Sequence, residues 1–520
     1  MNKTRFLIFS FFLASFFSCS KLKEKLNGNL SSGQVGNNSA GQLLQGVYVS
    51  LEFTFVSYEE VFALSGITTD EAIVPTRGGD WDDNGVWRQL HQQKWDADNV
   101  KIHDCFNHLS GVVFAATDLL QYQPTKRQQA EARFLRAWAM YWLLDLYNQV
   151  PYRNPGDNLI LPAKVYSGIT ALNYIISEVD SVEPILPSGP ASIANKYAAK
   201  VLLMKCYLNK AVYTDRVNFA SFDPADMDSV IKFADDVINN GPFQFSQDYF
   251  DNFSPSNRTM GTENIFTQAS GRDIGYPIND AWQNGLGYYN NGLGGWNGFT
   301  TLSEFYQKFD PADQRFQQVY SYPNSPSNPR NAVNVGFLIG QQYDPYTGDL
   351  IYDAHSRANM IYTPDVSVIE KGPNLDEPGI RPIKYAPDYV NFYGPSTNDF
   401  VYLRFPDVLL MKAEAIMRGG TSINNAGGYG TDPVSLVNSI RTDKSRGVIK
   451  LSTLSEIDLY NERGRELWWE NWRRQDMIRF KQYLLPFQEK EYPSDPKYLL
   501  FPIPNDQLAV NPNLKQNPGY

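Results

Sequence analysis

Two segments of the chain combine aromatic rings, glycines and hydrogen-bonding side chains in the mixture that sugar recognition requires. The first runs from residue 70 to residue 95 and holds acids, an arginine and tryptophans around Gly78, Gly79 and Gly85. An aromatic face stacks on the C–H side of a pyranose, while carboxylates, amides and arginine bind its hydroxyls. A structural loop pinned by buried tryptophans is the alternative interpretation of this segment.

The second segment, residues 281 to 299, alternates large rings with glycines. Glycine leaves room for a ligand to reach the rings, and simple interior packing of the rings is the alternative. No βαβ pattern surrounds the glycines, so a nucleotide-phosphate loop is not predicted. We expect this segment to meet the first one in a single binding surface. Its candidate contacts are Trp282, Tyr288, Tyr289 and Trp296.

Catalytic motifs are missing from the sequence. It contains no Gly-x-Ser-x-Gly elbow, no Walker loop and no His-Glu-x-x-His motif. Glu462, Glu466 and Glu470 form a stripe at helical spacing, and neighbouring arginines favour a structural ion network over a glycosidase pair. We therefore predict a protein that is not an enzyme and has no catalytic residues, with a glycan-active enzyme as the less favoured alternative.

Metal and cofactor sites are not predicted either. The pairs Asp82–Asp83 and Asp96–Asp98 lack the spacing of a calcium-binding EF-hand loop. His103, Cys105 and His108 are scattered around a helix, and no second pair of zinc ligands follows them.

The N-terminus has the order of an export signal. Lys3 and Arg5 precede an apolar run over residues 6–17 that is too short to span a bilayer. Ser18 and Cys19 follow and resemble the bacterial lipoprotein box, with an ordinary signal peptide and a chance cysteine as the alternative. We predict a lipoprotein signal peptide over residues 1–18, lipid attachment at Cys19, and a flexible tether over residues 19–40.

Composition excludes several classes of protein. The 520 residues carry a net charge of −10, which leaves no basic surface for a nucleic-acid backbone. A mean hydropathy of −0.40 excludes a polytopic membrane protein. Aromatic residues reach 14%, which suits both a large core and exposed platforms for sugars or peptides.

Apolar residues recur at helical spacing on both sides of an irregular middle region. The pairing of large residues with alanines resembles tetratricopeptide helix pairs. We predict a mostly α fold in one domain over residues 41–520, with a helical scaffold over 41–242 and 402–520 and a loop-rich ligand-binding region with short strands over 243–401. The expected helices cover residues 42–56, 105–122, 128–148, 169–185, 194–213, 226–240, 406–417, 433–442 and 455–479.

Several strings resemble the SusD/RagB family of outer-membrane lipoproteins, and together they span nearly the whole mature chain. The matching strings are AEARFLRA (130–137), KYAAK (196–200), YLRFPDVLLMKAEA (402–415), LVNSIR (436–441), ER (462–463), EL (466–467), RR (473–474), DMIRF (476–480), FPIP (501–504), NPNL (511–514) and QNPGY (516–520).

The resemblance implies a SusD-like fold with tetratricopeptide-like helical pairs, no catalysis, and docking on a TonB-dependent outer-membrane transporter. The ligand surface of the family includes residues of the first segment. The contacts that the resemblance selects there are Asp70, Arg77, Trp81 and Trp87. Family members bind glycans or, in some cases, peptides, so a glycan is the leading ligand and a peptide the alternative. The expected location is the outer membrane, lipid-anchored and facing the exterior.

Overall fold

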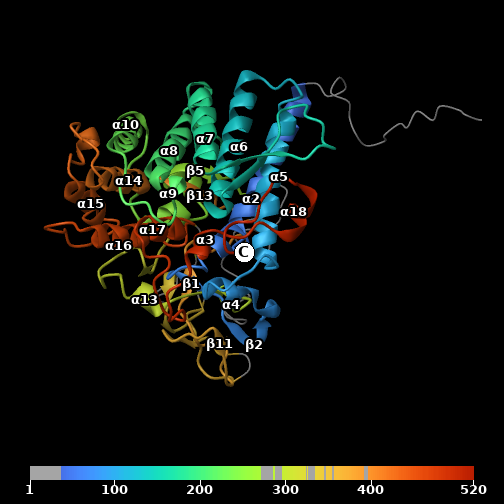
Figure 1. The fold of residues 1–520 in the computed structure, drawn as a ribbon. Helices are drawn as coiled ribbons and strands as arrows, with labels where there is room; N and C mark the ends of the chain where they lie inside the picture. Colours follow the sequence, from blue (N-terminus) through green and yellow to red (C-terminus); the bar gives the residue numbers. More distant parts are fainter. Residues whose placement is uncertain are drawn as a thin grey trace, which may run out of the picture.

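The computed structural model describes residues 37–270, 285–286, 295–323, 325, 334–344, 347–353, 356–391 and 396–520. Its long helices stand side by side across one half of the protein, each packed on the next in chain order (Figure 1). This row consists of α2 (Asn37–Val56), α5 (Val100–Leu119), α6 (Lys126–Tyr147), α7 (Gly168–Val182), α8 (Lys196–Leu208), α10 (Pro224–Asn240), α14 (Phe405–Met417) and α15 (Pro433–Arg441).

The helix boundaries follow from the sequence. Helix α6 begins after Thr125, whose hydroxyl accepts from the backbone N–H of Gln128, while the Gln128 side chain accepts from the backbone N–H of Thr125. Such a reciprocal cap satisfies two otherwise unpaired donors. The helix ends at Asn148, which adopts a left-handed φ of 60°.

Shorter helices connect and flank this row. They are α3 (Val61–Ser65), η1 (Asp83–Gly85), α4 (Val86–His91), η2 (Glu183–Ile185), α9 (Lys210–Thr214), η3 (Tyr249–Phe253), α11 (Asn257–Met260), α13 (Ser303–Tyr306), η4 (Ala426–Gly428), α16 (Glu456–Glu466), α17 (Arg473–Arg479), η5 (Pro496–Leu499) and α18 (Asn505–Val510).

The strands are short and form small separate sheets. They pair as β1 (Ala72–Ile73) with β6 (Thr300–Thr301), β2 (Thr76–Trp81) with β11 (Ile369–Glu370), β3 (Gln149–Tyr152) with β4 (Lys164–Ser167), β5 (Asn264–Gln268) with β13 (Phe400–Arg404), β9 (Gly340–Gln341) with β10 (Ile361–Tyr362), and β8 (Val335–Leu338) with both β7 (Gln317–Gln318) and β12 (Arg381–Ile383). Most of them lie between residues 243 and 401, and the prediction of a mostly helical fold with a loop-rich middle is confirmed.

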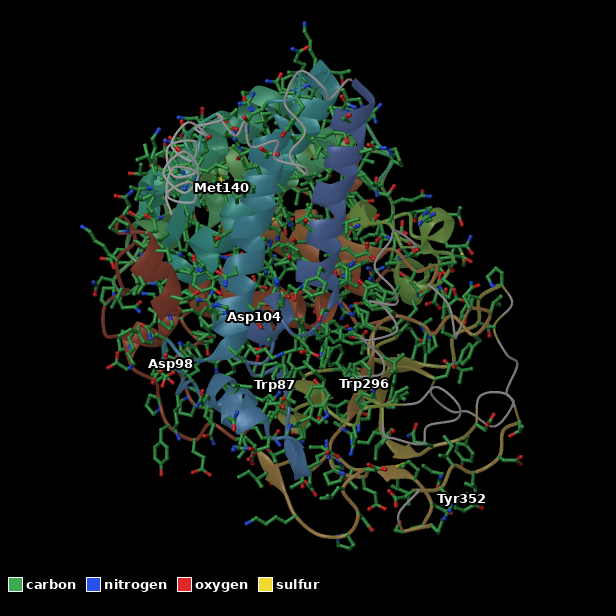
Figure 2. All side chains as sticks on the ribbon, turned by 90° about the vertical axis from the view of Figure 1, so that its right-hand side faces the viewer. Trp87, Asp98, Asp104, Met140, Trp296 and Tyr352 are labelled. Atoms are coloured by element: carbon green, nitrogen blue, oxygen red, sulfur yellow. The ribbon has the colours of Figure 1, made fainter. Side chains whose placement is uncertain are left out.

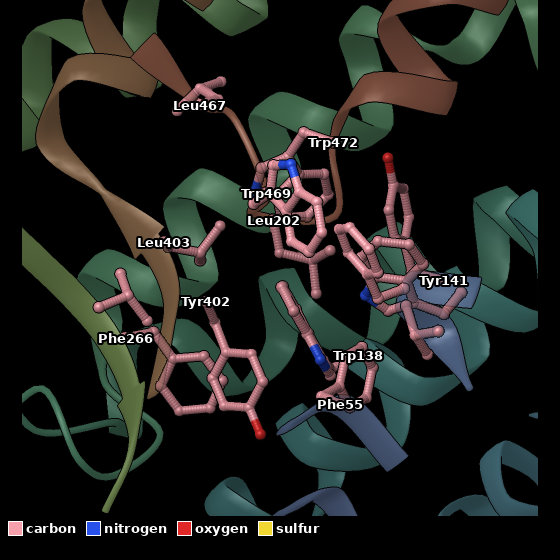
Figure 3. Close-up of a cluster of buried hydrophobic side chains, with 14 of the residues drawn as sticks. Phe55, Trp138, Tyr141, Leu202, Phe266, Tyr402, Leu403, Leu467, Trp469 and Trp472 are labelled. Atoms are coloured by element: carbon pink, nitrogen blue, oxygen red, sulfur yellow. The ribbon is translucent and has the colours of Figure 1, made fainter. Parts of the chain in front are cut away.

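Trp138 of α6 lies at the centre of an aromatic core (Figure 3). Its side chain is fully buried, and its ring centroid lies 6.1 Å from Phe55, 5.8 Å from Phe266, 5.7 Å from Tyr402 and 6.1 Å from Trp472. These rings come from α2, β5, β13 and the segment between α16 and α17, so the core joins the helical row to the C-terminal part of the chain.

The expected ion network around the glutamate stripe is present and buried. Glu466 binds the guanidinium groups of Arg315, Arg404 and Arg446 at 3.0, 2.8 and 2.5 Å. Glu462 binds Arg315 at 2.7 Å and Arg465 at 2.6 Å. Most of these partners come from distant segments rather than from the arginines next to the stripe.

Three elements differ from the expectation. The helix expected over residues 194–213 is two helices, α8 and α9, which are separated by Asn209. The helix expected over residues 455–479 is two helices, α16 and α17, because Trp469 and Asn471 take left-handed φ values of 58° and 70° between them. The Trp469 backbone N–H donates to a carboxylate oxygen of Glu71 at 2.6 Å, which holds this turn in place. The aromatic segment over residues 70–95, for which no helix was expected, contains α4.

Within the described ranges, no helix combines the length and the apolar character needed to cross a bilayer.

Candidate ligand-binding site

Strand pairing brings the two aromatic segments together. Strands β1 and β6 run antiparallel, with Ala72 opposite Thr301 and Ile73 opposite Thr300. The Thr301 hydroxyl donates to the backbone carbonyl of Glu71 at 2.5 Å. Because β2 follows β1 directly, the loop after β2 lies beside the chain that precedes β6.

Trp81 and Trp296 meet at this junction. The indole N–H of Trp81 donates to the backbone carbonyl of Trp296 at 2.6 Å, although the two residues are 215 positions apart. The Trp296 side chain is 43% exposed and Trp81 is half-buried. The two segments therefore meet at these two residues, and their joint use as a binding surface stays a prediction.

Two buried aromatic rings pack against Trp81. Its ring centroid lies 5.7 Å from Trp87 and 5.5 Å from Phe299, and both of these rings are buried. Figure 2 shows Trp87 and Trp296 in the lower half of the protein, where the blue N-terminal segment meets the yellow one. The packed base holds the half-buried Trp81 indole rigidly and leaves part of its surface exposed.

The loop after β2 holds strained backbone. Trp81, Asp83 and Asn84 take positive φ values of 59°, 40° and 55°. A non-glycine residue in this region costs energy and persists only where its surroundings enforce it, which is common at binding sites.

Hydrogen bonds fix this loop from within. A carboxylate oxygen of Asp83 accepts from the Trp87 indole N–H at 2.7 Å. Arg88 binds Asp82 at 2.5 Å and also donates to the Thr76 hydroxyl. Asp80 and Asp83 are exposed and lie one and two positions from Trp81, so the segment that carries Trp81 also carries carboxylates that can accept from ligand hydroxyls.

Asn297 anchors the opposite segment, a role that was not predicted. Its side chain is buried, its φ is 54°, and its amide N–H₂ donates to Asp376 at 2.6 Å. Its carbonyl accepts from Arg381 at 2.7 Å. These bonds position the neighbouring Trp296. An asparagine between a tryptophan and a glycine is a signal for such a left-handed turn.

The predicted contacts Asp70, Arg77 and Trp87 lie inside the protein. Asp70 is bound by both Nε and a terminal nitrogen of Arg473 at 2.7 Å. Burial raises the pKa of Asp70, but the Arg473 guanidinium outweighs burial and the pKa is lowered overall. The placement of Asp70 makes it part of the interior framework rather than of an exposed contact surface.

Arg77 joins three segments. Its guanidinium donates to the backbone carbonyls of Leu375 at 2.9 Å and Pro378 at 2.8 Å, and to the Thr300 hydroxyl at 3.2 Å. Only 2% of its surface is exposed. Arg77 thus holds the walls of the site together, and Trp87 supports the Trp81 ring.

The remaining predicted residues lie outside the described ranges. These residues are Cys19, Trp282, Tyr288 and Tyr289. Over the part of the chain that is described, no three His, Cys, Asp or Glu side chains gather in a way that could hold a metal ion.

Comparison with known proteins gives consistent matches. A sequence model of the SusD family matches residues 243–520. The starch-binding protein SusD of Bacteroides thetaiotaomicron is 23% identical, and the match covers 89% of this chain and 86% of that protein.

Solved structures share the fold. A SusD superfamily protein from Parabacteroides distasonis has a TM-score of 0.69 at 18% identity, covering 95% of this chain and 100% of its own. Surface glycan-binding protein A from Bacteroides thetaiotaomicron, solved in complex with laminarihexaose, has a TM-score of 0.67 at 18% identity, covering 93% and 99%. At these identities the likeness establishes the SusD-like fold.

Proposed function

The chain belongs to the SusD family, and from that premise we propose that it is a surface lipoprotein that captures a glycan for a TonB-dependent outer-membrane transporter. The relatives support the glycan part, since one is named a starch-binding protein and another was solved with laminarihexaose. The proposed delivery to a transporter rests on the family resemblance. The proposed lipid anchor rests on that resemblance and on the order of residues 1–19.

The observation that carries the proposal is the contact between Trp81 and Trp296. It joins an exposed indole face to a loop bearing exposed carboxylates. A sugar needs both, because its C–H face stacks on a ring and its hydroxyls need acceptors. Each stacking contact is worth only about 0.5–1.5 kcal/mol, so we expect a chain of several sugars to bind along the surface.

Calorimetry on the full-length, detergent-purified protein tests the ligand class. Starch-type and laminarin-type oligosaccharides and a set of mixed peptides would be titrated, and the saccharides recovered afterwards. We expect saturable binding of a saccharide that is recovered at its original length. Binding of peptides alone would identify a peptide-binding protein instead, and shortened saccharides would identify an enzyme.

Affinity isolation from outer membranes tests the transporter. We expect the tagged protein to retain a TonB-dependent transporter in comparable amount after washing at moderate salt. Recovery of the protein alone would contradict the delivery role and leave glycan capture standing.

A further inference from the structure

A third segment, residues 369–381, lies against both aromatic segments. At its start, β11 runs parallel to β2, the strand that ends in Trp81. Near its end, the backbone carbonyl of Ile380 accepts from the backbone N–H of Thr301 at 3.0 Å, in the strand that follows Trp296. This segment therefore touches the strands that place both tryptophans.

The backbone carbonyl of Leu375 accepts hydrogen bonds from both aromatic segments. Arg77, on β2, donates to it through Nη1 at 2.9 Å, and Asn297, next to Trp296, donates through Nδ2 at 3.1 Å. The Leu375 side chain also lies close to β2, because a Cβ atom placed on Gly78 would be 2.6 Å from its Cδ1 atom. One peptide unit of the third segment thus holds the two aromatic segments at a fixed separation.

Asp376, Asn297 and Arg381 form a buried cluster in which each residue is bonded to the other two. The Asn297 side-chain N–H₂ donates to the Asp376 carboxylate at 2.6 Å. Nη2 of Arg381 donates to the Asn297 side-chain carbonyl and to the Asp376 backbone carbonyl, both at 2.7 Å. All three residues are at most 1% exposed. Only one orientation of the Asn297 amide satisfies both a carboxylate and a guanidinium, so this side chain is fixed.

The backbone of Asn297 determines where the Trp296 carbonyl points. That carbonyl and the Asn297 N–H belong to one planar peptide unit. The N–H donates to the Leu286 backbone carbonyl at 2.8 Å, and the carbonyl accepts from the Trp81 indole at 2.6 Å. Asn297 has a φ of 54°, which costs energy in a non-glycine residue and persists only where the surroundings enforce it. The side-chain bond to Asp376 is part of that support.

We propose that Asp376 is a positioning residue for the ligand surface. By holding the Asn297 side chain, Asp376 orients the peptide unit that receives the Trp81 indole N–H, and it thereby fixes Trp81 and Trp296 relative to each other. The inference rests on the proposed function for its ligand. It deepens that function by adding a residue that lies outside both aromatic segments and touches no ligand.

Fluorine NMR of the full-length protein labelled with fluorotryptophan tests this positioning without any ligand. Trp81→Phe and Trp296→Phe identify the two signals, and the signal of the buried Trp138, identified in the same way, is the internal reference. Asp376→Ala should shift the Trp81 and Trp296 signals and leave the reference in place. Asp376→Asn keeps an oxygen that can accept from Asn297, so it should leave both signals near their positions in the unmodified protein.

Asn297→Gly keeps the test decisive if Asp376→Ala does not fold. Glycine adopts a φ of 54° without strain, so this variant removes the side-chain bonds and keeps the backbone conformation accessible. It should shift the same two signals. Unchanged Trp81 and Trp296 signals in every folded variant of this set would overturn the positioning role.

Calorimetry with a saccharide that binds the unmodified protein separates positioning from general destabilisation. Asp376→Ala should weaken binding by up to the roughly 2- to 12-fold expected for loss of one aromatic stack. Combined with Trp296→Ala, the total loss should be smaller than the product of the two single losses, because both changes act on the same contact. A combined loss equal to that product would contradict the inference. If no saccharide binds the unmodified protein, the proposed function fails, and the fluorine signals still decide the role of Asp376.

Discussion

The Trp81 indole N–H donates to the backbone carbonyl of Trp296 at 2.6 Å and thereby joins two loops that are 215 residues apart. The bond uses the polar edge of the Trp81 indole. The exposed face at the junction belongs mainly to Trp296, which is 43% exposed. The surface therefore exists only when the chain is folded, and each prediction below separates loss of folding from loss of ligand contact.

Asp70→Asn should destabilise the protein by about 3–5 kcal/mol, because it leaves the buried Arg473 guanidinium without its carboxylate. Urea unfolding measures this loss. At low urea, where the variant is folded, its glycan affinity should match the unmodified protein. The exposed Asp365→Asn is the control and should change stability by less than about 0.5 kcal/mol. If the unfolding free energy of the variant is unchanged and its glycan binding is lost, Asp70 is a ligand contact after all.

Trp138→Ala should cost about 3–5 kcal/mol of unfolding free energy, since it opens a cavity among the rings of the core. Phe114→Ala on the neighbouring α5 is the control, because that ring is 45% exposed and should cost much less. A loss below about 1 kcal/mol for Trp138→Ala would show that the ring is not part of the core.

Acid should weaken the fold through the buried glutamates. Burial raises the pKa of Glu462, but Arg315, Arg465 and Arg441 outweigh burial and lower the pKa to about 2. Arg479 and Arg418 likewise lower the pKa of Glu414 to about 2 against its burial.

A lowered folded-state pKa contributes stability above the unfolded value of about 4.5, and this contribution is lost as the pH falls towards 2. The free energy of unfolding, obtained from urea titrations between pH 7 and pH 3, should stay high down to about pH 5 and then drop by a few kcal/mol. A stability that is flat down to pH 3 would contradict ionised glutamates in this network.

Cys19→Ala should release the protein from membranes into the soluble fraction. One acyl chain holds a protein only weakly, so stable anchoring requires several chains on this residue. Fractionation of cells after washing without detergent measures the change, and Ser20→Ala serves as the control that keeps the cysteine. Equal membrane retention of both variants would rule out Cys19 as the anchor.

Local periodicity was enough to predict the helices. Residues 128–148 carry large and small side chains at helical spacing, a threonine cap and an asparagine end, and α6 has nearly these bounds. The loop-rich middle was also visible, because glycine, proline and asparagine interrupt every apolar run there. The burial of Trp138 follows from the same spacing.

The features that could not be predicted from the sequence depend on contacts between residues far apart in the chain. An acid, an arginine and tryptophans look alike whether they face water or the interior, and Asp70 is buried because Arg473 reaches it from 403 residues away. The break between α16 and α17 has the same origin, since Glu71 holds the Trp469 backbone across 398 residues. Trp81 and Trp296 were predicted from the sequence as ligand contacts. The roles of Arg77 and Asn297, which hold the flanking segments in place, could be seen only in the folded structure.

Titration of Trp296→Ala with a saccharide that binds the unmodified protein tests the central claim most directly. The full-length variant should show the same urea midpoint as Ile160→Ala, an alanine control at a side chain that is 91% exposed elsewhere. We predict that calorimetry finds the saccharide bound about 2- to 12-fold more weakly by Trp296→Ala and unchanged by Ile160→Ala. Equal affinities of the two variants would contradict a binding surface built on Trp81 and Trp296.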